Sequence, residues 1–172
     1  MSDAEIEAAL AHIGDYKRFS PAVMRNKTVA LRAVRYTTAL VKYVPPELMK
    51  DPEFVLSLLS ERVYPLVLDH VSSTLKRDEA FILEFMKKHP WQALKFARSS
   101  LRKKLGNDKD LIMIAISMDA RVLPYISSEL LQEEVILRRS LMAPNITHYA
   151  RSLPAHAWEN LSFVGEVAAM HP

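Results

Sequence analysis

Short apolar runs recur along the chain, and each follows an acidic or amide side chain by three residues. The clearest are 51–56 (DPEFVL), 78–83 (DEAFIL) and 108–113 (DKDLIM), and 26–31 and 132–137 follow the same plan more loosely. An Asp or Asn side chain at such a position accepts hydrogen bonds from backbone N–H groups in the first turn of a helix. The pattern therefore predicts a helix after each cap, with Pro52 tolerated as a first helical residue.

A second pattern alternates with the first: a ring side chain followed five positions later by an apolar residue, usually Leu or Met. The ring positions are Phe19, Tyr43, His70, Phe96, Tyr125 and, more weakly, Tyr149. Successive ring positions lie 24, 27, 26, 29 and 24 residues apart. Ser and Pro between ring and Leu disfavour a helix interior, and Pro90 and Pro124 fall where a proline can open a helix. Each period predicts a helix of about ten residues, a turn and a shorter helix.

A period of this length is too short to bury its own apolar face, so its neighbours must cover it. The sequence therefore predicts an all-α fold of stacked helical hairpins that form a short α-solenoid-like repeat array. We expect one helical-repeat domain over 1–172, with the ring and Leu positions packed between repeats. The expected repeats are roughly 2–25, 26–50, 51–77, 78–107, 108–131 and 132–156, followed by a terminal helix at 157–172.

Four segments carry a resemblance to a known family. They are 51–59 (DPEFVLSLL), 91–102 (WQALKFARSSLR), 107–116 (NDKDLIMIAI) and 123–131 (LPYISSELL). They resemble tandem short helical repeats catalogued as a domain of unknown function, whose units read D-x-E-x-V-L and then A-L-x-Y-A-S-x-x-L. The resemblance implies a helical-repeat fold over about 26–140 and brings no catalytic residues with it. Such repeats occur in bacterial and other proteins, some of which resemble effectors of intracellular bacteria.

Composition narrows the class of protein. Glycine occurs only at three positions and cysteine is absent, which disfavours a β-rich fold and excludes disulfides and thiol chemistry. The N-terminal residues lack the order of a signal peptide, and no apolar run reaches the length of about 20 residues that a membrane helix needs. We therefore expect a protein without a membrane span, in the cytoplasm, or in the host cytosol if the chain is a secreted effector.

Positive charge is concentrated in the middle of the chain. Residues 76–109 contain ten basic and four acidic side chains, a net charge of +6, whereas 1–75 are neutral and 110–172 carry −3. The candidate binding surface consists of Lys87, Lys88, Lys95, Arg98, Arg102, Lys103 and Lys104. This concentration of charge has three possible interpretations. It is a solvated helix face that complements the helix dipole, a contact for an acidic protein, or a contact for nucleic acid or anionic lipid.

The segment 95–110 also differs from its counterparts in length. Leu75 precedes the cap Asp78 by three residues, whereas Leu101 precedes Asp108 by seven. Four extra residues are about one helical turn, so the second helix of this repeat is expected to continue to Leu105. Gly106 would then take the left-handed conformation that commonly ends a helix.

No motif points to a reaction. The six histidines form neither an HExxH motif nor a pair four residues apart, and His70 at a ring position is expected to be packed. The serine pairs 72–73, 99–100 and 127–128 repeat with the period, which indicates capping or turn roles rather than nucleophiles. We therefore expect no catalytic residues, no metal and no cofactor.

The sequence thus favours a non-catalytic helical-repeat protein that mediates protein–protein interaction. One alternative is nucleic-acid or anionic-surface binding through 76–109. The other is an enzyme inhibitor or effector-type module with no readable site.

Overall fold

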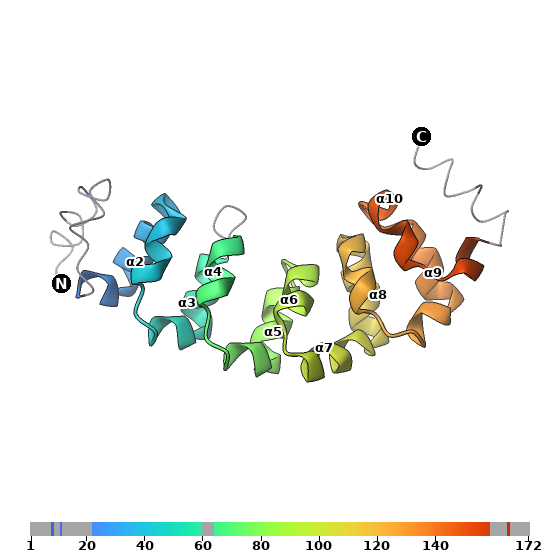
Figure 1. Ribbon diagram of the computed structural model, residues 1–172, viewed down its shortest axis with the longest axis horizontal. Coiled ribbons are helices and arrows are strands. Elements are labelled where there is room, and N and C mark those ends of the chain that lie inside the picture. Colours follow the sequence, from blue (N-terminus) through green and yellow to red (C-terminus); the bar gives the residue numbers. More distant parts are fainter. Residues whose placement is uncertain (1–7, 9–10, 12–21, 60–63, 159–164, 166–172) are drawn as a thin grey trace. The chain divides into compact units, whose positions relative to one another are not determined.

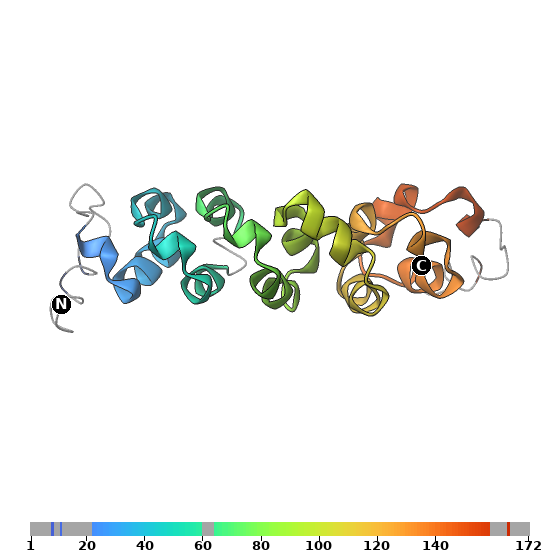
Figure 2. The same cartoon turned by 90° about the horizontal axis from the view of Figure 1, so that it is seen from below.

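The computed structural model describes residues 8, 11, 22–59, 64–158 and 165. Every regular element among them is helical, and Figure 1 and Figure 2 draw coiled ribbons and no arrows. The predicted all-α class is therefore confirmed, whereas the stacking of hairpins into an array stays a prediction. The chain divides into two compact units, Met1–Asp78 (unit 1) and Glu79–Pro172 (unit 2).

The described part of unit 1 consists of α-helices and short 3-10 helices. Its elements are η2 (Val23–Arg25), α2 (Lys27–Tyr36), η3 (Thr38–Tyr43), η4 (Leu48–Lys50), α3 (Pro52–Leu58), α4 (Tyr64–His70) and η5 (Leu75–Arg77). Helix α2 packs against α3 and η3, and α4 packs against η3. The apolar sides of these elements form the core of the unit, which includes Val29, Val34 and Phe54.

Unit 2 begins with two helices that pack against each other, α5 and α6. Its described elements are α5 (Glu79–Met86), α6 (Pro90–Phe96), α7 (Ser99–Gly106), α8 (Lys109–Met118), η6 (Ala120–Tyr125), η7 (Leu130–Gln132), α9 (Glu134–Leu141), α10 (Ile146–Tyr149), η8 (Ala150–Ser152) and η9 (Ala155–Trp158). Three rings, Phe81, Phe85 and Phe96, join α5 to α6, with centroids 6.1 to 6.3 Å apart. The terminal helix predicted at 157–172 lies almost wholly outside the described residues.

The predicted helix starts are confirmed where the cap is Asn26, Asp51 or Asp108, because each side chain accepts a hydrogen bond from a first-turn N–H. Pro52 and Pro90 are the first residues of α3 and α6.

Two other expectations, for Gln132 and for Pro124, differ from the structure. The start expected after Gln132 is wrong by one residue, since Glu133 takes the cap position without a side-chain bond. The expectation for Pro124 is also wrong: it lies inside η6 and opens no helix. A short 3-10 helix accepts a proline near its end, because proline lacks an N–H and removes only one backbone bond there.

The ring-and-Leu pattern is confirmed at most of its Leu positions, although Leu48 is only half-buried, and in part at its rings. Leu75, Leu101 and Leu130 are buried, and so is Phe96. Tyr125 is half-buried, whereas the prediction of a packed ring at His70 is wrong, because this residue ends α4 and faces solvent. The last turn of a short helix leaves a polar ring free to reach water, and burial is not needed there.

Candidate binding groove

The structure places the seven candidate basic residues in two groups at opposite ends of α6. Lys87 and Lys88 lie in the turn between α5 and α6. The other five begin at Lys95 in the last turn of α6 and continue through Arg98, which precedes α7, to residues 102–104 within α7. Helix α6 has seven residues and therefore separates the two groups by about 10 Å. In Figure 1 helix α7 lies below the α5–α6 pair.

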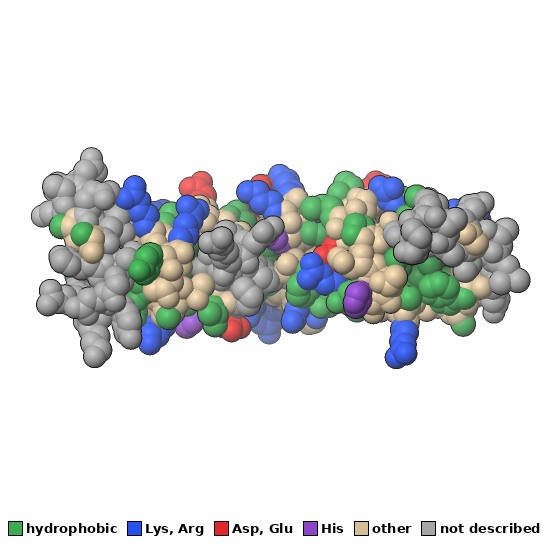
Figure 3. Space-filling view, turned by 90° about the horizontal axis from the view of Figure 1, so that it is seen from above, with side chains coloured by type: hydrophobic (Ala, Val, Ile, Leu, Met, Phe, Trp, Pro, Cys, Tyr) green, Lys and Arg blue, Asp and Glu red, His purple; other side chains and the backbone are tan. Residues whose placement is uncertain are grey.

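Several of these cations already have partners in the fold. Lys87 bonds to Glu84 one turn earlier in sequence, at 2.5 Å. Lys104 holds both carboxylate oxygens of Glu79 at 2.7 and 2.8 Å. The Lys95 ammonium lies 5.6 Å from the ring centre of Trp91. On the face drawn in Figure 3, Lys and Arg side chains of unit 2 are interspersed with side chains of other types.

Arg102 is bound to the backbone at the end of α6. Its Nε donates to the carbonyl of Leu94 at 2.7 Å, and one terminal nitrogen donates to the carbonyls of Lys95 and Ala97, each at 2.8 Å. The guanidinium also lies 5.5 Å from the ring centre of Tyr125. Carbonyls in the last turn of a helix have no partner within the helix, so a planar cation there stabilises the end. Arg102 therefore holds α6, α7 and η6 together.

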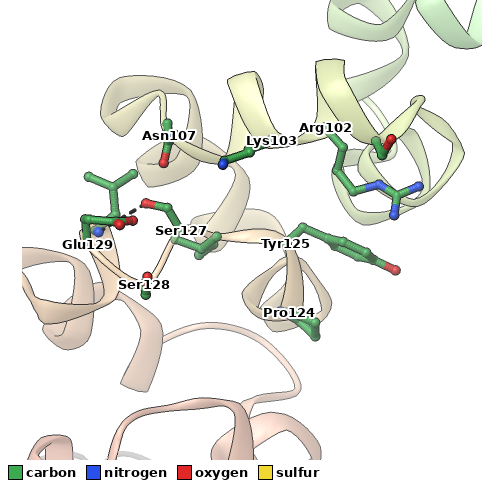
Figure 4. Close-up of a pocket in the computed structure, with 11 residues that line it drawn as sticks. Arg102, Lys103, Asn107, Pro124, Tyr125, Ser127, Ser128 and Glu129 are labelled. Atoms are coloured by element: carbon green, nitrogen blue, oxygen red, sulfur yellow. Dashed lines mark hydrogen bonds between the residues drawn. The ribbon is translucent and has the colours of Figure 1, made fainter.

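Lys88, Arg98 and Lys103 remain exposed, and none of them forms a salt bridge with a described residue. Lys103 differs from the other two because it borders a groove in unit 2, between α7 and the segment 124–130. The groove is open to solvent and has a volume of about 830 Å³. Its lining residues are Ser99, Arg102, Lys103, Asn107, Pro124, Tyr125, Ile126, Ser127, Ser128, Glu129 and Leu130. Figure 4 shows Lys103 and Asn107 on one side and Ser127, Ser128 and Glu129 on the other.

Gly106 brings the two walls of the groove together. The amide of Ser127 donates to the Gly106 carbonyl at 3.0 Å. A Cβ at position 106 would lie 2.1 Å from the carbonyl oxygen of Tyr125, a distance that no side chain can occupy. The predicted continuation of this helix to Leu105 is confirmed, but the left-handed conformation predicted for Gly106 is wrong, since no described glycine has a positive φ. Glycine is needed here because a backbone carbonyl approaches it, and not because of its own conformation.

The second wall is held in shape by its serines. The Ser127 hydroxyl accepts from the amide of Leu130 at 3.2 Å, which starts the 3-10 turn η7. The Ser72 hydroxyl accepts from the amide of Thr74 in the corresponding turn of unit 1. The predicted turn role of the serine pairs is therefore confirmed for Ser72 and Ser127.

Glu129 is the acidic residue of the groove lining. Its own backbone N–H and the Ser128 hydroxyl bond to the carboxylate and lower its pKa, and Ser127 and the charge of Lys103 lower it further. The carboxylate is therefore ionised at neutral pH. The groove thus presents the cations Arg102 and Lys103 on α7 and one anion opposite them.

The described residues offer no metal centre: nowhere among them do three His, Asp or Glu side chains gather closely enough to hold an ion. Within the same residues no helix is both long and apolar enough to cross a membrane. Comparisons with protein-family models, curated proteins and solved structures found no match.

Sequence reasoning found Arg102 and Lys103 and missed the wall from Pro124 to Glu129. That wall carries ordinary turn residues, and nothing in their order shows which distant helix they meet. The available signal was the extra helical turn before Asp108. It lengthens α7 and places Lys103 and Asn107 beside the next turn.

Proposed function

We propose that this chain is a non-catalytic helical-repeat protein that binds a segment of a protein partner in the groove between α7 and residues 124–130. The observation that carries the proposal is the groove itself. It is open to solvent, and its lining mixes apolar groups such as Pro124 and Ile126 with hydroxyl, amide and charged groups. A mixed lining of this kind suits a peptide segment, which offers both backbone polar groups and side chains.

The architecture behind the proposal is a short array of stacked helical hairpins. Its support is a contact that recurs with the sequence period. Lys27, the first residue of α2, bonds to Asp51 in the cap position of α3, and the two are 24 residues apart. Lys109, the first residue of α8, bonds in the same way to Glu133 in the cap position of α9, again 24 residues away. A repeated contact between successive repeats is what a stacked array requires.

Rigid walls make the groove suitable for binding. One wall is α7, tied to α6 by the three backbone bonds of Arg102. The other wall is fixed by the Gly106–Ser127 bond and by the bond from the Leu130 amide to the Ser127 hydroxyl. A site that is already formed loses little conformational entropy when a ligand binds, so a short segment can bind with useful affinity.

The test is selection of short random peptides on the full chain, followed by a variant that fills the groove. Ser128→Trp places a large ring in the groove, and Ser73→Trp changes the corresponding exposed serine of unit 1. We expect selected peptides to bind the native chain and Ser73→Trp equally and to lose binding to Ser128→Trp. Thermal melting checks that both variants fold. Peptides that bind Ser128→Trp as well as the native chain would place the binding site elsewhere, and a selection that yields no peptide would refute the proposal.

Nucleic-acid binding is the rival that the basic segment 76–109 raises. The fold uses much of that charge internally, through Lys87–Glu84, Lys104–Glu79 and the backbone bonds of Arg102. Binding of single-stranded RNA or duplex DNA, measured as salt is raised, separates the two functions. Affinity that falls steeply with salt and decreases equally in Lys88→Gln and Lys103→Gln would favour the rival.

A further inference from the structure

Three successive cations of α7 meet three different environments. Arg102 donates to carbonyls at the end of α6, and Lys104 holds the carboxylate of Glu79. Lys103 lies between them in sequence and borders the groove, with no salt bridge to a described residue. Figure 4 shows its side chain over the space between α7 and Ser127, while Arg102 extends the other way. Lys103 is therefore the cation of this helix that an incoming ligand meets.

The opposite wall forms no salt bridge with Lys103. Its own amide and the Ser128 hydroxyl, then the Ser127 hydroxyl and the charge of Lys103, lower the pKa of Glu129, so the carboxylate is charged. No salt bridge joins this carboxylate to Lys103 across the groove. The lining therefore has two positive charges and one negative charge, and one of the positive charges faces open solvent.

We propose that the groove selects an acidic, extended segment of the protein partner and that a carboxylate of this segment binds the Lys103 ammonium. This inference rests on the proposed function and names the chemistry of the ligand. The Lys103 side supplies the charge, Ser99 and Asn107 supply hydrogen bonds, and the apolar surfaces of Pro124 and Ile126 contact the rest of the segment. Complementary charge of this kind sets which partner binds and how fast it arrives.

The same residues argue against a phosphate backbone as the ligand. Nucleic acid needs several cations in a row and aromatic faces on which bases can stack. In this groove Lys103 is one exposed cation, and the ring of Tyr125 is covered on one face by the guanidinium of Arg102. A protein segment with a few carboxylates requires neither feature.

The inference is tested by sorting the peptides selected on the native chain by net charge. The best binder is then measured against Lys103→Gln, Glu129→Gln and Lys88→Gln. Lys88 is the matched control, because it is exposed, forms no salt bridge with a described residue and lies outside the groove.

We expect the selected peptides to be enriched in Asp and Glu. Lys103→Gln should weaken binding about 3- to 5-fold, because one partly solvated ion pair is lost. Glu129→Gln should strengthen binding about 2- to 3-fold, because a like charge is removed from the other wall. Lys88→Gln should leave it unchanged. Effects of opposite sign on the two walls cannot come from partial unfolding.

Other results overturn the inference and separate it from the proposed function. Selected peptides could be neutral or basic and still lose binding to Ser128→Trp. That result would support the groove as the binding site and would refute the proposal that its ligand is acidic. Equal losses in Lys103→Gln and Lys88→Gln, together with tighter binding of single-stranded RNA than of any peptide, would assign the charge to nucleic acid. Selection of no peptide would reject both proposals.

Discussion

The carboxylate of Asp51 bonds to Lys27, the first residue of α2, while it also caps α3. One side chain therefore starts a helix and ties it to the start of the helix one period earlier. The same kind of contact joins Lys109 to Glu133 in unit 2. The Glu133 side chain, however, makes no hydrogen bond that caps α9. Local capping and the contact between successive helices are thus separate interactions that happen to coincide at Asp51.

This coincidence predicts how stability depends on pH. The bond to Lys27, and then the amide of Phe54, lower the pKa of Asp51 in the folded chain. A lowered carboxyl pKa gives stability that is fully present above the unfolded value of about 3.9 and is lost as pH falls through the folded pKa. The bond to Asp51 raises the pKa of Lys27, so its contribution is present below about 10.4 and is lost as pH rises through the folded pKa.

Asp51→Asn tests this relationship, since Asn can still cap the helix and loses only the charge. We expect urea unfolding at neutral pH to show a destabilised variant, and the difference from the native chain to shrink in acid. Lys88→Gln serves as the control, because it removes an exposed charge that has no salt bridge with a described residue. A difference between Asp51→Asn and the native chain that stays constant from neutral pH into acid would contradict the assigned role of the pair.

Gly106→Ala tests the close approach of the groove walls. The added methyl group would lie 2.1 Å from the Tyr125 carbonyl oxygen, so the wall must move or the variant must lose stability. Overpacking against a backbone of this kind costs about 1–3 kcal/mol. Gly165→Ala is the matched control, because a methyl group added there would meet no atom within 4 Å, and alanine favours a helix. Thermal unfolding should show a lower Tm for Gly106→Ala and an unchanged or higher Tm for Gly165→Ala.

We predict that Arg102 stabilises the fold rather than binding the ligand through its charge. Arg102→Ala removes three bonds to the backbone at the end of α6, and we expect a loss of about 1–3 kcal/mol in the free energy of unfolding. Arg102→Lys should recover only part of it, because one ammonium cannot reproduce the planar donor geometry. Arg98→Ala, at the exposed cap position of α7, should change the free energy of unfolding little. Equal losses from Arg102→Ala and Arg98→Ala in urea unfolding would contradict this role.

The sequence predicted best what depends on neighbours along the chain. Asp51 and Asp108 cap helices because their side chains reach N–H groups two or three residues ahead, and such contacts can be read from spacing. The buried Leu101 and Leu130 follow from the same periodicity.

What the sequence could not supply was contact between distant segments. The contact of Gly106 with Tyr125 joins two segments that no local pattern relates, so the sequence predicts the usual left-handed conformation for this glycine and does not reveal the groove. The exposure of His70 was missed for a similar reason. A ring position in a repeat predicts packing only if a neighbouring element covers it, and the side chain of His70 at the end of α4 is exposed.

The most direct test of the proposed site is a charge exchange between the chain and its ligand. The best acidic peptide from the selection is synthesised again with Lys in place of each Asp and Glu in turn. The binding affinity of every version is then measured for the native chain and for Lys103→Glu. We predict that Lys103→Glu weakens the acidic peptide and binds one of the Lys versions more tightly than the native chain does. A binding preference that is the same for native chain and Lys103→Glu would contradict the assignment of Lys103 and of the groove that it borders.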